Sequence, residues 1–165
     1  MKQLIESFKT FLEEGPKKDY IINSQITLYH YAPSNEEEIL LDPQRFGTSS
    51  FSKRERESST VPRIFFYTNL SQRERMVASN RSLYTVNIGE SMVYDLNTDP
   101  EGYVDSVRHP IYGLRKGIEL DELMYKIKEK YSGMFYTTGN MDIVAWFEPI
   151  MAKKVTDEER KSLEG

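Results

Sequence analysis

The sequence predicts an α+β protein with a mostly antiparallel sheet. Three observations support this prediction: short branched or aromatic runs that alternate every second residue, turn residues between those runs, and few segments with helical spacing. The chain has 165 residues, which fits a single domain able to bury a core of its own. With 38% apolar and 29% charged residues, it is neither a wholly disordered chain nor a membrane protein.

The spacing of apolar residues predicts three helices, at residues 1–14, 71–80 and 118–130. The first carries one apolar stripe and ends at Gly15-Pro16, so residues 1–15 are expected to form a docking helix. The second has Ser71 as its expected N-cap. The residues of the third helix expected to face the core are Leu120, Leu123, Met124 and Ile127.

Branched and aromatic residues between turn signals predict six strands. These strands are expected at residues 26–31, 63–68, 82–88, 92–96, 134–138 and 142–148. Alternation in the first strand places His30 on one face, with Ile26 and Leu28, and Tyr31 on the other. Residues 32–62 lack periodicity and are expected to form a long loop, of the kind that is usually functional or mobile. A single domain over residues 16–155 is then followed by a charged, frayed tail over residues 156–165.

The composition excludes several classes of function. The net charge of −4 makes the chain a poor candidate for general nucleic-acid binding, although a nucleic acid remains open as a substrate. The absence of cysteine excludes disulfides, thiol nucleophiles and thiolate metal sites. Two isolated histidines, His30 and His109, do not make a zinc site, so no metal is expected. We find no phosphate-binding glycine loop, no nucleophile-elbow serine, and no uninterrupted apolar stretch typical of a secretory signal.

After these exclusions, the candidates for a functional site are a histidine on a strand, clustered aromatic rings, and a carboxylate on another strand. A neutral imidazole can bind a ribose hydroxyl, because one ring nitrogen donates and the other accepts. An aromatic ring can stack on a flat heterocycle, and a carboxylate can stabilise a ribosyl cation. These parts suit cleavage of a nicotinamide–ribose bond. The alternative interpretation is that the histidine is a hydrogen-bonded structural residue.

The order of these elements resembles the ADP-ribosyltransferase fold, in particular the small domains found in bacteriophage proteins. Leu28-Tyr29-His30 is similar to the first-strand motif of that family. Leu41-Asp-Pro-Gln-Arg-Phe-Gly-Thr, followed by Arg63-Ile-Phe-Phe-Tyr-Thr, resembles its next conserved block, and Asp142-Ile-Val-Ala-Trp-Phe-Glu-Pro resembles its closing strand. The resemblance spans about residues 26–155 and implies a mostly antiparallel two-sheet core with a few flanking helices.

The resemblance also implies roles for individual residues. His30 would bond the nicotinamide ribose, and Asp142 would occupy the catalytic position where active members often carry Glu. Phe66 or Tyr67 would stack on nicotinamide; the usual tyrosine is thus either replaced by Phe or displaced by one residue. The residues expected to bind the cofactor are His30, Tyr31, Gly47, Thr48, Arg63, Phe66 and Tyr67.

The implied activity is transfer of ADP-ribose from NAD, which is a substrate here, to a macromolecular acceptor. The resemblance suggests a phage-derived protein that acts in the host cytoplasm on a host or defence protein, without a membrane partner. NAD hydrolysis is an alternative outcome of the same chemistry. A second class of function also stays open: a non-catalytic binding or virion-associated module, or an inhibitor of a host protein, that retains the fold.

Overall fold

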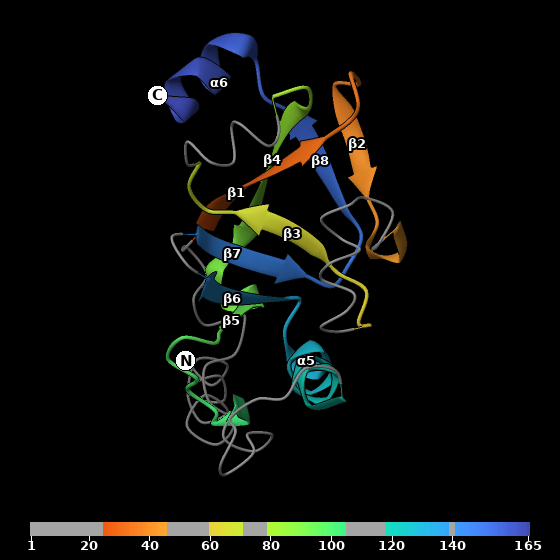
Figure 1. Cartoon of the computed structure of the whole chain (residues 1–165), viewed down its shortest axis with the longest axis vertical. Coiled ribbons are helices and arrows are strands. Elements are labelled where there is room, and N and C mark those ends of the chain that lie inside the picture. The colour runs from red at the N-terminus through yellow and green to blue at the C-terminus, as the bar shows by residue number, and fades with distance from the viewer. Residues whose placement is uncertain (1–24, 46–59, 71–78, 105–117, 139–140) are drawn as a thin grey trace, which may run out of the picture.

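The computed structural model describes residues 25–45, 60–70, 79–104, 118–138 and 141–165 (Figure 1). Its strands form one eight-stranded sheet in the order β2-β8-β4-β1-β3-β7-β6-β5. Every neighbouring pair is antiparallel except β5 and β6. The predicted α+β class with a mostly antiparallel sheet is therefore confirmed. The strands are β1 (Gln25–Ala32), β2 (Glu38–Leu41), β3 (Ile64–Tyr67), β4 (Ser82–Gly89), β5 (Val93–Asp95), β6 (Gly133–Thr138), β7 (Met141–Trp146) and β8 (Ile150–Lys154).

Two α-helices and two short 3-10 helices accompany the described strands. The α-helices are α5 (Ile118–Lys130) and α6 (Asp157–Glu164), and the 3-10 helices are η1 (Pro43–Arg45) and η2 (Glu90–Met92). The prediction for α5 is confirmed, and its residues Leu123, Met124 and Ile127 are buried. The predicted helices at residues 1–14 and 71–80 lie outside the described residues, apart from the last two positions of the second. In the described part of the chain, no helix has the length and apolar character needed to cross a membrane.

The structure differs from the sequence-based expectation at β2, β8 and α6. Strand β2 lies inside the expected long loop and pairs with β8, which follows Pro149. Each of these two strands is short; β8 also pairs with β4, whereas β2 takes its backbone partners from β8. The expected frayed tail contains α6, whose N-cap Thr156 accepts a hydrogen bond from the Glu159 amide at 3.2 Å.

One continuous sheet is present where the resemblance implies two. It consists of two four-stranded halves, β2-β8-β4-β1 and β3-β7-β6-β5, joined by pairing between β1 and β3. That junction has a single aligned pair, Tyr29 opposite Tyr67, whereas β1 and β4 align over the whole of β1. The junction is therefore the narrowest ladder in the sheet, although the pairing there still makes the sheet continuous.

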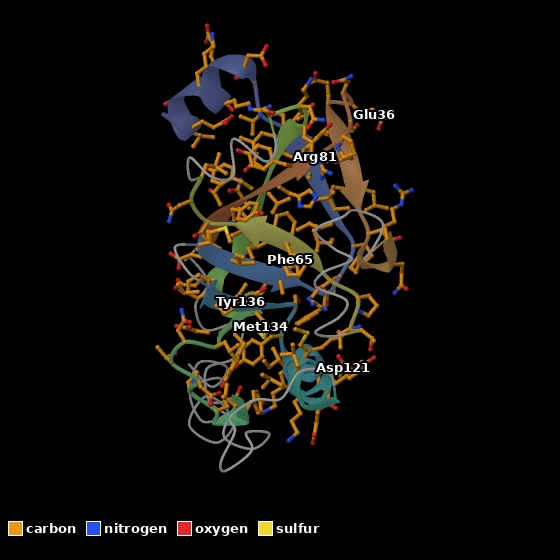
Figure 2. All side chains as sticks on the ribbon, in the orientation of Figure 1. Glu36, Phe65, Arg81, Asp121, Met134 and Tyr136 are labelled. Carbon is orange, nitrogen blue, oxygen red and sulfur yellow. The ribbon has the colours of Figure 1, made fainter. Side chains whose placement is uncertain are left out.

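Alternation along the strands divides the core between the two faces of the sheet. On one face, buried residues of α5 form one cluster with Phe65, Met134 and Ile143. Figure 2 labels Phe65 and Met134 on their strands and Asp121 on α5. The hydroxyl and amide of Thr60, just before β3, donate to the Asp121 carboxylate of α5 at 2.7 and 2.9 Å. The opposite face buries a second cluster that draws on both halves of the sheet. Its members include Leu28, Phe66, Tyr84, Val86, Val144 and Trp146.

Gly133 is expected to be intolerant of a side chain. A Cβ added at this first residue of β6 would lie 2.9 Å from the Trp146 ring and 3.1 Å from the Ala145 carbonyl oxygen. Both neighbours belong to a packed strand, so Gly133→Ala should lower the free energy of unfolding by about 1–3 kcal/mol. The matched control is Gly89→Ala, whose added Cβ would meet side-chain atoms no closer than 3.6 Å. Urea unfolding of both variants tests this, and equal stabilities would contradict the packing described here.

Candidate functional site

His30 is held in one orientation by the backbone of the neighbouring strand. Its Nδ1 lies 2.7 Å from the carbonyl oxygen of Phe65. Because a carbonyl can only accept, Nδ1 must carry the proton in this bond, and Nε2 of the neutral ring keeps its lone pair. The imidazole also contacts the Phe66 ring, with the two centroids 5.6 Å apart. The half-buried His30 therefore offers Nε2 as a fixed acceptor.

The surroundings of His30 favour its neutral form. Burial lowers the pKa of this imidazole most, and the positive charge of Arg81 lowers it further. The hydrogen bond to Phe65 acts in the opposite direction, but the net effect places the pKa below its ordinary value of 6.5. At neutral pH the ring is therefore uncharged and suited to accepting a hydrogen bond from a hydroxyl group.

The lowered pKa predicts a specific loss of stability in mild acid. In the unfolded chain His30 takes up a proton as the pH falls through 6.5, whereas the native ring resists protonation until lower pH. The unfolded state then binds more protons, so the free energy of unfolding should fall as the pH drops below about 6.5. Urea unfolding at about pH 7.5 and about pH 5.5 should show a smaller decrease for His30→Gln than for the parent. Comparison with His109→Gln separates the two histidines, and an unchanged decrease in His30→Gln would contradict this assignment.

Asp142 is oriented by a chain of hydrogen bonds across two strands. The Thr137 hydroxyl donates to the Asp142 carboxylate at 2.6 Å, from the directly opposite position on β6. The Asn97 amide group donates to the Thr137 oxygen at 3.0 Å and accepts from the Thr137 backbone amide at 3.2 Å. Because the Asn97 side chain donates to the Thr137 hydroxyl oxygen, the single proton of that hydroxyl is free to point to Asp142. The Asn97 backbone amide in turn donates to the Asp95 carboxylate at 2.9 Å.

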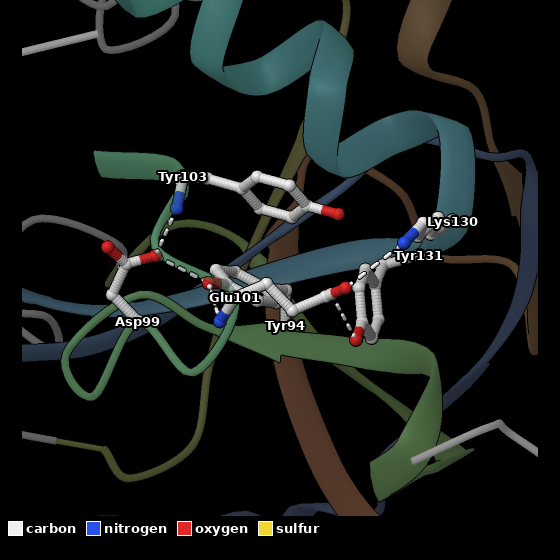
Figure 3. Close-up of polar contacts among 6 residues, drawn as sticks. All are labelled: Tyr94, Asp99, Glu101, Tyr103, Lys130 and Tyr131. Atoms are coloured by element: carbon white, nitrogen blue, oxygen red, sulfur yellow. Dashed lines mark hydrogen bonds and ion pairs between the residues drawn. The ribbon is translucent and has the colours of Figure 1, made fainter. Parts of the chain in front are cut away.

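A cluster of tyrosines anchors the loop that follows Asn97 (Figure 3). The Asp99 carboxylate accepts from the Tyr94 hydroxyl and from the backbone amides of residues 103 and 104. Glu101 accepts from Lys130 at 3.1 Å and from the Tyr131 hydroxyl at 2.8 Å, which ties this loop to the end of α5. Burial is the largest cause that raises the pKa values of Tyr94 and Tyr131, so both hydroxyls stay protonated donors. The loop carrying Asn97 is thus fixed at its far end.

The sheet brings His30, Phe66 and Asp142 to one face of three neighbouring strands, β1, β3 and β7. Phe66 lies opposite Val144, and Asp142 is two residues from Val144 on the same strand face. The register of β1 and β3 places His30 opposite Phe66. Two strand spacings across and two residues along give a Cα–Cα separation of about 12 Å between His30 and Asp142. Phe66 and Val144, which lie between these two residues on that face, are fully buried.

Three of the other predicted residues lie on the opposite face. Tyr31 and Tyr67 face each other there, with ring centroids 6.4 Å apart, and the Arg160 guanidinium lies 5.4 Å from the Tyr31 centroid. Arg63 is buried, lies over the Phe65 ring and donates to the Val61 carbonyl oxygen at 2.8 Å. These contacts hold the three side chains away from His30.

The two proposed stacking residues are separated by strand alternation. Phe66 shares the face of His30, is fully buried and packs directly against the imidazole. In this position it supports His30 from within the core, and a stacking role for it stays a prediction. Gly47 and Thr48 lie outside the described residues. Among the described residues, no group of three or more His, Asp or Glu side chains is placed to hold a metal ion.

Sequence reasoning missed Thr137, Asn97 and Arg81. A signal for Thr137 existed in the sequence, because the turn residues Gly139-Asn140 predict a two-residue hairpin with Thr137 opposite Asp142, and this is the observed register. No comparable signal pointed to Asn97, which reaches Thr137 from a loop 40 residues earlier in the chain. The effect of Arg81 on His30 depends on the tertiary fold.

Comparison of this chain with protein-family models, with curated proteins and with solved structures gives no match. Function is therefore inferred from the residues and their arrangement.

Thr137 should act on Asp142 through its hydroxyl group. Thr137→Val keeps the shape of the side chain but removes the donor, so Asp142 loses its 2.6 Å hydrogen bond. If Asp142 acts in turnover, kcat for NAD consumption should fall by about tenfold, as expected for a misplaced catalytic group, with little change in KM. Thr137→Ser retains the hydroxyl and should restore most of the activity. A fall that is equal in the serine variant, or confined to KM, would contradict the positioning role.

Proposed function

We propose that this protein cleaves the nicotinamide–ribose bond of NAD and transfers ADP-ribose to a macromolecular acceptor. The observation that supports the proposal best is the convergence of His30 and Asp142 on one face of neighbouring strands, with Phe66 between them. The resemblance to the ADP-ribosyltransferase fold assigned the same residues to this chemistry from the sequence. The narrow junction between the two halves of the sheet is also compatible with a core derived from two sheets.

In the proposed reaction His30 binds the ribose next to nicotinamide. Its Nδ1 proton is committed to the Phe65 carbonyl, so Nε2 accepts a hydrogen bond from a ribose hydroxyl. A neutral imidazole suits this role, since a positive charge beside the ribose would oppose the cation that forms during bond cleavage. The Phe66 ring packed against His30 limits its rotation.

Asp142 is proposed to stabilise the ribosyl cation. As the bond between ribose C1 and the nicotinamide nitrogen breaks, its electron pair moves to nicotinamide and positive charge develops on the ribose. A carboxylate held by Thr137 faces that charge without having to reorient. The acceptor nucleophile then forms a bond to C1 and loses its proton, whereas attack by water would give ADP-ribose. The acceptor is proposed to be a host protein.

The proposal is tested by incubating the protein with NAD labelled in the adenylate phosphate and a bacterial lysate. Transfer predicts nicotinamide release together with label on a macromolecule, and Asp142→Ala should abolish most of both. Label recovered only as free ADP-ribose would identify a hydrolase instead. No NAD consumption by the parent protein under any of these conditions would favour the non-catalytic module.

A further inference from the structure

The turn that carries Asn97 is closed by two hydrogen bonds to the same residue. The Asp99 amide donates to the Asp95 carbonyl oxygen at 2.9 Å, and the Asn97 amide donates to the Asp95 carboxylate at 2.9 Å. Asp95 is the last residue of β5 and pairs with Phe135 on β6, so the sheet fixes the first end of the turn. The second end is Asp99, which lies outside the strands and depends on other contacts.

Asp99 adopts a left-handed backbone conformation, with a φ of 45°. Residues that carry a Cβ atom enter this region only at a cost in free energy, although asparagine and aspartate do so more readily than others. Without support, Asp99 would therefore relax to negative φ and change the direction of the chain on both sides. Asn97 is only two residues away, so this relaxation would withdraw its side chain from Thr137.

The carboxylate of Asp99 provides this support (Figure 3). It accepts hydrogen bonds from the Tyr94 hydroxyl and from the backbone amides of Tyr103 and Val104. The Tyr94 side chain is fully buried, and its hydroxyl also accepts from the Glu101 amide at 3.0 Å. Three donors therefore fix the carboxylate, and the carboxylate in turn holds the backbone of Asp99.

We propose that Asp99 is a positioning residue for Asp142. It acts through a relay of contacts: the Asp99 carboxylate holds the turn, and the turn holds Asn97. The Asn97 side chain then directs the Thr137 hydroxyl to the Asp142 carboxylate. The catalytic role of Asp142 rests on the proposed function, whereas the relay itself is a property of the fold. The orientation of Asp142 thus depends on the loop that follows β5.

Hydrogen exchange of the full-length protein tests the relay without NAD. The Thr137 amide donates to the Asn97 side-chain oxygen at 3.2 Å, so its exchange rate reports whether Asn97 is in place. Asp99→Ala should speed exchange of the Thr137 amide by at least about tenfold, to a rate close to that in Asn97→Ala. Unchanged exchange at Thr137 in a folded Asp99→Ala protein would overturn the proposal.

Two milder variants identify the feature of Asp99 that holds the turn. Asp99→Gly adopts positive φ without strain but lacks the carboxylate, so it should also speed exchange at Thr137. Asp99→Asn tolerates the left-handed conformation and keeps one side-chain oxygen as an acceptor, so it should restore most of the protection. Parent-like exchange in Asp99→Gly, or no rescue in Asp99→Asn, would show that the carboxylate contacts do not position Asn97.

A matched pair of tyrosine variants separates the relay from a general loss of stability. Tyr94→Phe removes the hydroxyl that donates to Asp99, and Tyr84→Phe removes a hydroxyl that donates to the Glu36 carbonyl oxygen at 2.6 Å. Both tyrosines are fully buried, so each variant loses one hydroxyl from a packed ring. Only Tyr94→Phe should speed exchange at Thr137 beyond any change in the amides of β1 and β4. Equal effects of the two variants at Thr137 would contradict the relay.

Turnover of NAD in a double-mutant cycle tests the connection to Asp142. Asp99→Ala should lower kcat by about three- to tenfold with little change in KM, as expected for a misplaced catalytic group. In the Thr137→Val background the same substitution should cause no further fall, because the relay is already broken at Thr137. Additive effects, or a fall confined to KM, would overturn the positioning role. A parent without turnover that still shows the predicted exchange pattern would refute the proposed function and support the relay.

Discussion

Replacing Asp142 by alanine is expected to lower the rate of NAD cleavage by about 10²–10³, the usual loss when a preorganised electrostatic group is removed. The affinity for NAD should change far less. Ground-state NAD carries its positive charge on nicotinamide, and the charge on ribose appears only in the transition state. Single-turnover measurements at saturating NAD separate these effects. A variant that loses affinity but keeps its rate would contradict the assigned role.

The substitution Asp142→Glu is a more discriminating test of the same site than Asp142→Ala. The longer side chain would no longer place its carboxylate against the Thr137 hydroxyl in the present geometry. If the site is built around aspartate, as the Asn97–Thr137–Asp142 chain suggests, activity should fall in Asp142→Glu. A rise in activity would instead indicate that Asp142 is a degraded form of the glutamate that active ADP-ribosyltransferases, which the sequence resembles, often carry at this position. The alanine variant serves as the lower reference for both results.

Phe66→Ala should have the largest effect on stability among the residues around His30. The ring is fully buried in the cluster that contains Leu28 and Val144, and it contacts the imidazole directly. Removing it leaves a cavity in the sheet core, so the free energy of unfolding should fall by about 3–5 kcal/mol. Urea denaturation measures this loss, and Tyr125→Ala on the exposed side of α5 is the control. A decrease no larger than that of the control would contradict the packing of Phe66.

Phe66→Leu tests whether the aromatic ring also supports His30. This substitution keeps most of the apolar volume and should cost less than about 1.5 kcal/mol. It removes the ring contact at 5.6 Å, so NAD affinity should nevertheless weaken if His30 binds the ribose. Unchanged affinity in a stable Phe66→Leu variant would limit the role of Phe66 to packing.

Local patterns predicted the central strands and α5, because each carries its own periodicity. The run from Ile64 to Tyr67 and the helix from Ile118 to Lys130 could be identified from single segments. Strands β2 and β8 could not be identified in this way, because their short sequences lack the aromatic and β-branched run of β3, and their strand form depends on pairing with distant segments: β2 with β8, and β8 with both β2 and β4. The same limit applies to α6, whose charged sequence gives little apolar periodicity and whose Arg160 is held by the Arg81 carbonyl.

Local patterns likewise predicted some features of the candidate site, whereas others depend on contacts between distant segments. Alternation within β1 correctly placed His30 and Tyr31 on opposite faces, and the strand positions of Phe66 and Asp142 were predictable. Which strands are neighbours depends on long-range pairing, and so does the hydrogen bond that orders the His30 ring. The positioning of Asp142 by Asn97 is likewise a tertiary contact. Single-sequence patterns carry no information about such contacts between distant segments.

The central claim is that His30 binds the ribose of NAD through Nε2, and NMR of the imidazole nitrogens tests it most directly. NAD added to protein labelled with ¹⁵N-histidine should shift the Nε2 resonance of His30. The Nδ1 proton should remain bonded to Phe65, and His30→Gln should remove the signal and weaken NAD binding. Two results would contradict the proposed site: an Nε2 resonance that does not move as NAD is added, or a change in its chemical shift that never saturates with NAD concentration.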